Sequence, residues 1–311
     1  MYDPTKPYKH RILKLIESTW RTPYVRVTRG IYPIFTKRFS FPEVQHTDGI
    51  GTKGFFHWKA RTFKNAVQDA LAMNLNDLAL VGAEPYALQN HIVLPKDDHT
   101  AILEIVSALA TECRKYHIAM TGGETSIHAD MPGMDISITV SGFIRKPIKN
   151  KCQAGDILIG LKSNGLHSNG MTRVRAALGN RVNPEFTRPT TIYLGMILGL
   201  LKKYEVHSMM HITGGAFSKL KDILGKNDAI IEFPRSFKPR PIFYELYKRG
   251  ISSKDMYTTF NCGIGFALSV APKDANKILS EVKSSLIIGR MEKGRGEVRI
   301  KSVFDGKIIR L

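Results

Sequence analysis

The sequence lacks the features by which several protein classes are recognised. No apolar stretch reaches about eighteen residues, so no transmembrane helix is predicted. The 3 cysteines, Cys113, Cys152 and Cys262, form no CxxC pair; we expect reduced thiols, with neither a disulfide framework nor a structural zinc site. Residues 1–14 carry charges where a signal peptide needs an apolar core. We therefore expect a cytoplasmic protein with no membrane partner.

Acidic residues are scarce relative to basic ones. The chain has 27 Asp and Glu against 46 Lys and Arg, a formal net charge of +19. Such a charge favours anionic partners, and nucleic acid is one class of these. However, the basic residues are spread along the chain, without a run of five and without a known nucleic-acid-binding motif. A site for phosphorylated small molecules is the favoured interpretation, and a nucleic-acid-binding protein is the alternative.

The P-loop pattern G-x-x-x-x-G-K-[ST] is also absent, yet a glycine-rich turn occurs elsewhere. His46-Thr-Asp-Gly-Ile-Gly-Thr-Lys53 places a carboxylate on that turn, followed by a hydroxyl and an ammonium. Glycine lets the backbone approach an anion closely, and a carboxylate there can hold the Mg²⁺ that binds phosphate. We interpret the turn as a nucleotide site in which Lys53 reaches a phosphate oxygen. A plain β-turn between strands is the alternative.

Two further carboxylates are predicted close to this turn. Residues 65–81 have helical periodicity, and Asp69, Asn76 and Asp77 fall on a face away from the apolar stripe. A solvated face is the alternative, but the segment contains no Lys or Arg. A strand at 117–121 then runs into Gly122-Gly-Glu-Thr125. Asp48, Asp77 and Glu124 together can form a hard-oxygen Mg²⁺ site.

The second half of the chain offers a candidate substrate loop. Residues 146–152 are polar and basic, and we place a domain boundary there, giving domains 1–146 and 147–311. A buried strand at 155–161 opens into a loop rich in Ser, Asn and Gly, which ends at Gly170 before a helix. Backbone amides at such a helix start form an anion site. An ordinary capped helix is the alternative.

The order of the expected elements indicates the fold class. Helices are predicted at 10–20, 65–81, 100–115, 171–178, 189–204, 241–249 and 272–284. Strands are predicted at 25–27, 31–35, 117–121, 136–144, 155–161, 208–213, 229–233, 263–270, 298–303 and 307–311. Alternating elements with some antiparallel pairing indicate an α/β or α+β protein, and no internal repeat is present.

Several motifs in one order carry a resemblance. They are Asp48-Gly-Ile-Gly-Thr-Lys53, Asn76-Asp-Leu-Ala-Leu-Val-Gly-Ala-Glu-Pro85, Gly122-Gly-Glu-Thr125, Met131-Pro-Gly-Met134, Gly165-Leu-His-Ser-Asn-Gly170, His211-Ile-Thr-Gly-Gly215 and Met256-Tyr-Thr-Thr-Phe-Asn-Cys-Gly-Ile-Gly265. This series resembles the aminoimidazole ribonucleotide synthetase family of de novo purine synthesis over about residues 46–290. The first three motifs are also similar to thiamine-monophosphate kinase, selenophosphate synthetase and the hydrogenase-maturation dehydratase. A relative that phosphorylates another small molecule is therefore the alternative.

The resemblance implies an ATP-dependent ring closure of formylglycinamidine ribonucleotide. It also implies a homodimer of two-domain subunits, in which N-terminal mixed sheets form a shared barrel and the C-terminal sheet is covered by helices. The family departs from this chain at Gly30-Ile-Tyr-Pro-Ile-Phe35, where it usually has a glycine-rich segment, and at Ser126–Asp130, where its link is usually shorter.

The resemblance also implies roles for individual residues. ATP is expected to contact Thr47, Asp48, Gly49, Gly51, Thr52, Lys53, Asp69, Asn76 and Asp77, with Mg²⁺ on Asp48, Asp77 and Glu124. The ribonucleotide is expected to contact Ser163, Asn164, His167, Ser168, Asn169, Thr213, Gly214, Gly215 and Asn261. His167 is the candidate catalytic residue, although a loop histidine of this kind is more often a positioning donor.

Overall fold

The computed structural model describes residues 6–311, which form two compact units. The N-terminal unit contains the chain up to Ala79, then Ala83–Lys146, and also Val182–Ile192. We call Val182–Ile192 the strap, because it comes from the second half of the sequence but belongs to the first unit. The C-terminal unit contains Leu80–Gly82, Pro147–Arg181 and Tyr193–Leu311.

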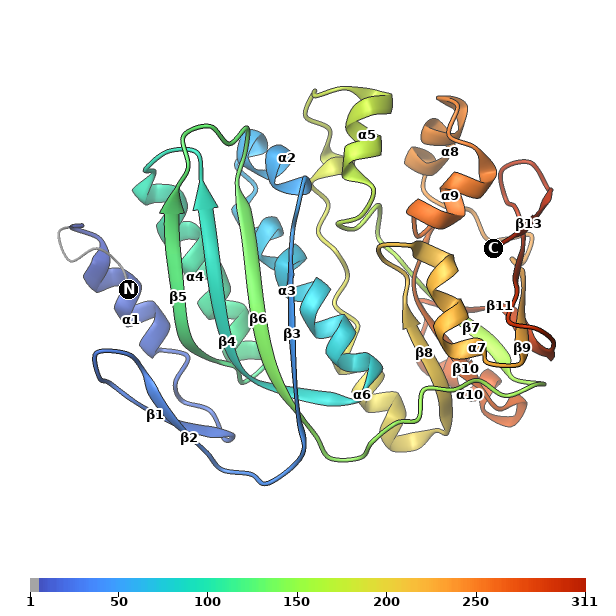
Figure 1. Ribbon diagram of the computed structural model, residues 1–311, viewed down its shortest axis with the longest axis horizontal. Helices are drawn as coiled ribbons and strands as arrows, with labels where there is room; N and C mark the ends of the chain where they lie inside the picture. Colours follow the sequence, from blue (N-terminus) through green and yellow to red (C-terminus); the bar gives the residue numbers. More distant parts are fainter. Residues whose placement is uncertain (1–5) are drawn as a thin grey trace. The chain divides into compact units, whose positions relative to one another are not determined.

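A four-stranded mixed sheet forms the centre of the N-terminal unit. Its strand order is β3 (Glu43–Gly49), β6 (Asp135–Ile144), β4 (Ala83–Leu94) and β5 (Ala119–Ile127). The β4–β5 pair is parallel and the other pairs are antiparallel. Helices α3 (Phe63–Leu80) and α4 (His99–Lys115) lie behind this sheet in Figure 1. One face of the sheet is therefore covered by helices, and its strand ends present the motifs.

Apolar packing explains why the α3 and α4 segments fold as helices. Buried residues recur along α4 at helical spacing, and Asp98 caps its start by accepting a hydrogen bond from the backbone N–H of Ala101. Along α3, the buried set includes Asp69, Asn74 and Asn76 as well as the apolar residues. Buried polar side chains need hydrogen-bond partners, so this helix is built to hold neighbouring segments through its polar groups.

The N-terminal segment closes one edge of the sheet. After α1 (Lys9–Glu17), the indole N–H of Trp20 donates to the carbonyl of Met120 at 2.8 Å, and the Thr19 hydroxyl accepts from the amide of the same residue. A short antiparallel ribbon follows, formed by β1 (Val25–Thr28) and β2 (Ile34–Lys37). These contacts cover the edge at β5, while β3 is the strand at the other edge.

A seven-stranded sheet forms the core of the C-terminal unit. Its order is β13 (Ile308–Arg310), β12 (Val298–Lys301), β9 (Asn227–Glu232), β11 (Ser285–Lys293), β7 (Ile157–Lys162), β10 (Ile264–Val270) and β8 (Val206–His211). Only the β12–β9 pair is parallel. The main helices of this unit are α5 (Met171–Leu178), α6 (Leu194–Lys203), α8 (Pro241–Lys248), α9 (Ser253–Thr259) and α10 (Pro272–Glu281).

The predicted mixed α/β architecture is confirmed, with a sheet in each unit. The shared barrel concerns a dimer and stays a prediction. Three local differences matter for function. Residues Gly122–Thr125 continue strand β5 and do not form a turn. The helix predicted from Pro189 begins only at Leu194, and the residues before it belong to the extended strap. Helix α2 (Lys53–Ala60) and strand β4 were not predicted.

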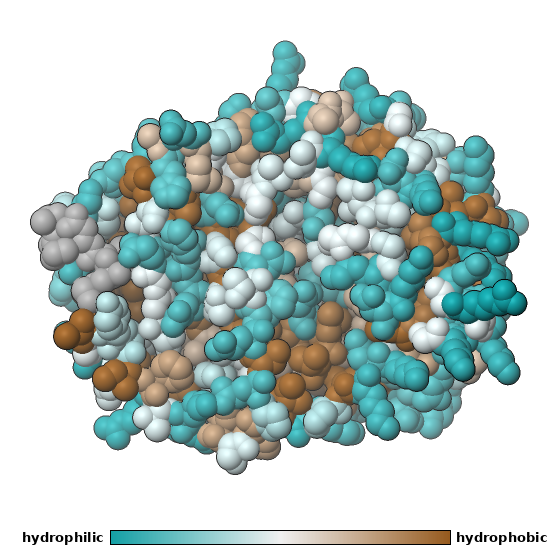
Figure 2. All heavy atoms as spheres, in the orientation of Figure 1, coloured by the Kyte–Doolittle hydropathy of each residue, from teal (hydrophilic) through white to brown (hydrophobic). Residues whose placement is uncertain are grey.

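The surface agrees with the absence of apolar runs in the sequence. Hydrophilic side chains cover most of the face shown in Figure 2, and hydrophobic side chains appear there in separate groups. Among residues 6–311, no helix is long and apolar enough to cross a membrane.

Candidate active site

The glycine-rich turn lies between a strand and a helix. Strand β3 ends at Gly49, the turn follows, and α2 begins at Lys53. Gly51 has a φ of +52°, which favours glycine. A Cβ on Gly54 would lie 1.8 Å from the carbonyl oxygen of Met134, so only glycine lets the Met131–Met134 loop pack this closely against α2. Two motifs that are distant in the sequence therefore meet at this turn.

Asp135 is a site residue that the sequence analysis did not identify. It directly follows the Met131–Met134 loop, and its carboxylate accepts a hydrogen bond from the backbone N–H of Ile136 at 2.9 Å. Burial raises the pKa of Asp135, the amides of Ile136 and Gly51 lower it, and the negative charge of Asp48 raises it further. The charge of Asp48 thus reaches Asp135, and two carboxylates beside one turn are suited to bind a cation. Its position immediately after a motif was the available signal.

His46 connects β3 to α3 beside the turn. Its Nδ1 lies 3.0 Å from Asn74 Oδ1, and its Nε2 lies 3.2 Å from Asp77 Oδ2. Asn74 also donates to the backbone carbonyl of Asp48. The hydrogen bond to Asp77 raises the pKa of His46 above its usual value. Asp48 and Asp77, both predicted to bind Mg²⁺, are thus brought to the same histidine.

Glu124 does not join them. Glu124 on β5 pairs with His91 on β4, which pairs with Ser137 on β6. Asp48 instead pairs with Ile138, which is fully buried on the helix-covered side. Directly opposed residues share a sheet face and alternate residues change face, so Asp48 and Glu124 point to opposite faces, and β6 and β4 lie between their two strands. Asp135, at the start of β6, shares the face of Ser137, but it lies on the strand next to β3, beside the glycine turn. Residues 6–311 contain no cluster of three or more His, Cys, Asp or Glu suited to a metal; the predicted trio is not assembled.

Lys53 has different partners from those predicted. Its ammonium lies 2.9 Å from Asp69 Oδ1, 2.8 Å from Asp69 Oδ2 and 2.6 Å from the carbonyl oxygen of Arg188, and the side chain is fully buried. Two of these contacts are hydrogen bonds, to Asp69 Oδ1 and to the Arg188 carbonyl, and the third is an ion-pair contact. In this structure the buried Lys53 therefore pairs with Asp69 and holds the strap.

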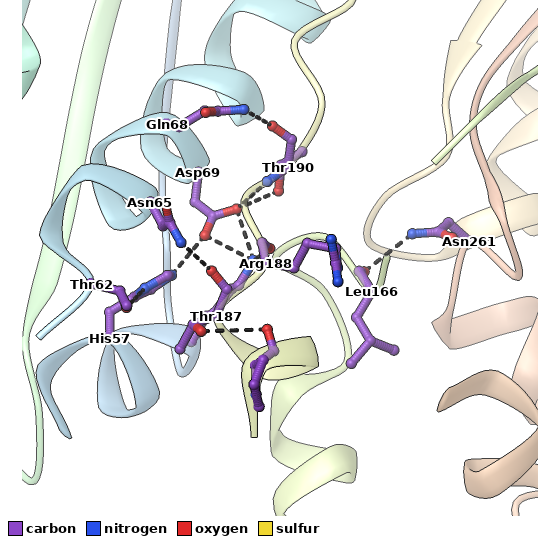
Figure 3. A network of polar contacts seen from close by, with 12 residues as sticks. His57, Thr62, Asn65, Gln68, Asp69, Leu166, Thr187, Arg188, Thr190 and Asn261 are labelled. Carbon is purple, nitrogen blue, oxygen red and sulfur yellow. Dashed lines mark hydrogen bonds and ion pairs between the residues drawn. The ribbon is translucent and has the colours of Figure 1, made fainter. Parts of the chain in front are cut away.

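Asp69 is the centre of this buried network (Figure 3). Besides Lys53, it accepts hydrogen bonds from His57 Nε2 at 2.7 Å and from the amide and hydroxyl of Thr190 at 2.7 and 2.5 Å. Burial alone would raise the pKa of Asp69, but the positive charge of Lys53 and the hydrogen bond from His57 hold it well below its usual value. Asp69 is therefore an ionised structural carboxylate, which differs from its predicted contact with ATP.

Amides on the same helix hold the strap at further points. Asn65 donates to the carbonyl of Thr187, Gln68 to that of Thr190 and Asn76 to that of Thr191, each at 2.9 Å. This explains why the polar face between residues 65 and 81 carries no lysine or arginine: its partner is backbone from elsewhere in the chain. Asn76, predicted near ATP, is fully buried against the strap.

The remaining predicted ATP residues stay near the turn. The hydroxyl of Thr47 lies 2.9 Å from that of Thr139 on the open face of the sheet. Thr52 precedes α2 and is exposed. These residues, with Gly49 and Gly51, line the surface where the strand gives way to the helix.

In the C-terminal unit, Asn261 shapes the predicted substrate loop. Its Oδ1 accepts from the Ser163 hydroxyl at 2.8 Å and from the Gly263 amide at 2.8 Å. Its Nδ2 donates to the carbonyls of Gly165 and Leu166. The side chain is 3% exposed. Asn261 therefore fixes the loop from within, which makes it a positioning residue where direct substrate contact was predicted.

His167 is buried in the same loop. It is 1% exposed, has a φ of +62°, and its ring centroid lies 6.3 Å from that of Tyr193. A Cβ on Gly265 would lie 2.1 Å from the Tyr193 hydroxyl and 2.5 Å from His167 Cε1. The motif glycine at 265 therefore creates the space for both rings.

The other predicted substrate residues surround this loop. Asn169 donates a short hydrogen bond to Thr213, which links the loop to the second glycine turn. In that turn Gly214 and Gly215 are exposed, whereas Asn164 and Ser168 in the loop are half-buried. The structure thus brings the loop and the second glycine turn together in one unit.

Comparison with known proteins matches both units to one family. The AIR synthase related protein N-terminal domain matches residues 41–144, and the AIR synthase related protein C-terminal domain matches residues 153–301. A phosphoribosylformylglycinamidine cyclo-ligase of Saccharolobus solfataricus is 33% identical over 320 residues, which cover 98% of this chain and 94% of the relative. The Bacillus cereus enzyme of the same name is 35% identical over 324 residues, 92% of each chain.

Solved structures with the same fold include more distant proteins. The Escherichia coli hydrogenase maturation protein HypE has a TM-score of 0.68 at 17% identity and covers 97% of this chain and 96% of its own. A HypE structure in complex with ATP has a TM-score of 0.65 at 14% identity, with 100% and 96% covered. Thiamine-monophosphate kinase from Stenotrophomonas maltophilia has a TM-score of 0.64 at 18% identity, with 98% of each chain covered.

Proposed function

The chain belongs to the phosphoribosylformylglycinamidine cyclo-ligase family, and we infer that it is an ATP-dependent ligase that closes the imidazole ring of aminoimidazole ribonucleotide in purine biosynthesis. The observation that carries this inference is likeness to the cyclo-ligases along almost the whole chain, through both units. A likeness limited to the N-terminal unit would fit a kinase equally well.

The inferred reaction has two steps, phosphorylation of the substrate and ring closure. The formyl oxygen of formylglycinamidine ribonucleotide attacks the γ-phosphorus of ATP and releases ADP. A substrate nitrogen then attacks the activated carbon, the C–O bond breaks, and phosphate leaves with that oxygen while a proton is lost. Positioning and charge neutralisation account for most of the catalysis in such phosphoryl transfers, so the chain needs no covalent nucleophile.

For Mg²⁺, we propose a site at the glycine turn, which Asp48 near the end of β3 and Asp135 at the start of β6 approach from the two faces of the sheet. Mg²⁺ usually binds through one or two carboxylates together with substrate phosphates and water. The effect of the Asp48 charge on Asp135 and the glycine backbone beside them support the assignment. Asp77 lies 3.2 Å from His46 Nε2, and it is a further candidate ligand that movement of His46 would release. When bound, the ion would neutralise charge on the phosphates.

For the ribonucleotide, we propose the loop of residues 163–170 and the second glycine turn. The hydroxyl and amide groups of Ser168 and Asn169 lie at the start of α5, where backbone amides favour a phosphate. His167, buried and surrounded by Tyr193 and Gly265, acts by positioning the loop or by donating a proton from within it. His167→Asn is expected to raise KM for the ribonucleotide far more than KM for ATP.

We also propose the arrangement of the whole enzyme. Residues 1–146 bind ATP and Mg²⁺ and form the interface of a homodimer, and residues 147–311 bind the ribonucleotide. The unpaired edge at β3 supports a role of the N-terminal sheet in pairing with a second copy. A cytoplasmic location fits both the reaction and the reduced cysteines, which are buried.

Measuring two products together tests the function. The pure protein is incubated with Mg²⁺-ATP and formylglycinamidine ribonucleotide, and free phosphate and aminoimidazole are determined. Ring closure predicts equal amounts of both. A stable phosphorylated product without aminoimidazole would instead identify a kinase of the same fold.

A further inference from the structure

The buried ion pair at the glycine turn raises the question of which cation meets a phosphate there. Lys53 was the cation predicted from the sequence, but its fully buried ammonium pairs with Asp69 and donates to the Arg188 carbonyl. Its charge is also offset by a carboxylate that is fully buried beside it. Phosphate recognition by side chains usually needs a cation with free donors. The next basic residue attached to this network is Arg188.

The strap brings Arg188 to the start of α2. The ring of Phe186 lies 4.8 Å from that of Phe56, in the first turn of the helix. The carbonyl of Arg188, two residues later, binds the side chain of Lys53, the first residue of the same helix. The strap thus runs beside α2, and the backbone of Arg188 reaches the side chain of Lys53, the residue that follows the glycine turn.

The guanidinium of Arg188 is only partly engaged. One terminal nitrogen donates to Glu185 at 3.1 Å, while Nε is buried and has no hydrogen-bond partner within residues 6–311. The side chain as a whole is 36% exposed. In Figure 3 it extends away from the Asp69 network, although its own carbonyl takes part in that network. A buried donor without a partner is costly, and an acceptor with two oxygens would satisfy it.

We propose that Arg188 binds a phosphate group at the glycine turn, and that Lys53 and Asp69 position it by holding the strap. This inference rests on the proposed function, because that function supplies two phosphate-bearing ligands. The group is part of the ATP triphosphate, the ligand proposed for the unit that contains Arg188, and the 5′-phosphate of the ribonucleotide is the alternative that the test separates from it. Both offer the paired oxygens that a guanidinium binds bidentately.

The division of roles follows from the chemistry of the two cations. Lys53 is a compact, fully buried ammonium paired with Asp69, so it fixes backbone position. Arg188 has a planar fork of donors and partial exposure, so it can bind an incoming ligand without breaking the buried ion pair. Because Lys53 binds the carbonyl of Arg188 and not its side chain, changing the side chain leaves the Lys53 contact in place.

Titration calorimetry on the full chain tests the proposal. Arg188→Met, Arg188→Lys and wild type are titrated separately with a non-hydrolysable ATP analogue in Mg²⁺ and with formylglycinamidine ribonucleotide. Arg188→Met is expected to weaken binding of one of these ligands by about 10- to 100-fold, and that ligand identifies the source of the phosphate. Arg188→Lys is expected to recover part of the loss, since the charge returns without the fork. Arg181→Met, an exposed arginine seven positions earlier, is the matched control and should bind both ligands as wild type does.

Results that refute the Arg188 proposal can be distinguished from results that refute the proposed function. If folded Arg188→Met binds both ligands within about twofold of wild type, the proposal is wrong. If Arg188→Met does not fold, Arg188→Lys decides, because unchanged binding of both ligands by that variant also rejects a bidentate contact. Ring closure by the wild type is measured independently. Binding by the wild type without formation of aminoimidazole would refute the proposed function and leave the Arg188 result interpretable.

Discussion

The ammonium of Lys53 donates a hydrogen bond to the carbonyl oxygen of Arg188 at 2.6 Å across 135 residues of sequence. A lysine that follows a glycine-rich turn would ordinarily be assigned to a phosphate. Here it connects that turn to a segment of chain from beyond the candidate substrate loop. The contact is made inside the N-terminal unit, where both residues belong to the same buried network.

The first prediction concerns Asp69→Asn. The substitution leaves the buried ammonium of Lys53 without its counter-ion, so we expect a loss of about 3–5 kcal/mol in the free energy of unfolding. Urea unfolding at neutral pH measures it. The exposed carboxylate Asp222 provides the control, since Asp222→Asn should change stability by less than about 0.5 kcal/mol. Equal, small effects of both substitutions would show that the network contributes little.

The second prediction is the response of the same residue to acid. The folded-state pKa of Asp69 lies below its unfolded value of 3.8. Its contribution to stability is therefore present above that value and is lost as the pH falls through the folded-state pKa. Wild type should lose stability more steeply than Asp69→Asn as the pH falls below about 4. Urea midpoints measured from pH 6 downward give the comparison, and parallel curves for the two proteins would contradict it.

The third prediction concerns Gly265→Ala in β10. The added methyl group would overlap the Tyr193 hydroxyl and the His167 ring, and overpacking of this kind costs about 1–3 kcal/mol. Gly195→Ala in α6 is the matched control, because nothing lies within 4 Å of its added Cβ and alanine favours helices. Thermal unfolding should show a lower Tm for the first variant and an unchanged or higher Tm for the second. A Tm of Gly265→Ala equal to wild type would show that the rings move freely.

The fourth prediction concerns metal dependence. Asp135→Asn removes one of the two carboxylates proposed for Mg²⁺, so the Mg²⁺ concentration that half-saturates binding of an ATP analogue should rise about tenfold or more. Asp130→Asn, an exposed carboxylate five residues earlier, should leave it unchanged. Calorimetric titrations at several Mg²⁺ concentrations separate the two. If Asp77→Asn shifts the Mg²⁺ dependence of binding and Asp135→Asn does not, the metal is bound beside Asp77 and not at Asp135.

The sequence predicted elements wherever one apolar face repeats at a fixed period. Helix α4 is an example, predicted at 100–115 and observed at His99–Lys115. The helix predicted from Pro189 began late, because Thr190 bonds to Asp69 through both its amide and its hydroxyl, at a separation of 121 residues. Periodicity within one segment contains no information about such a partner.

The sequence predicted which segments form the candidate site more successfully than it predicted the role of each residue. The glycine turn, the loop before α5 and the second glycine turn all occur at surfaces suited to ligands. Lys53, Asp69 and Asn261, however, are buried and fully engaged within the protein. A polar side chain in a motif can bind a ligand or hold the backbone that does, and the residue type is the same in both cases. Only the partners distinguish the two.

The central claim is that this chain activates the formyl oxygen with ATP and then expels it as phosphate. The most direct measurement places an oxygen isotope label in the formyl group of the ribonucleotide and follows it by mass spectrometry during turnover with unlabelled Mg²⁺-ATP in unlabelled water. The account predicts one labelled oxygen in each inorganic phosphate, formed in step with aminoimidazole. Unlabelled phosphate, or label retained in a phosphorylated small molecule, would contradict it.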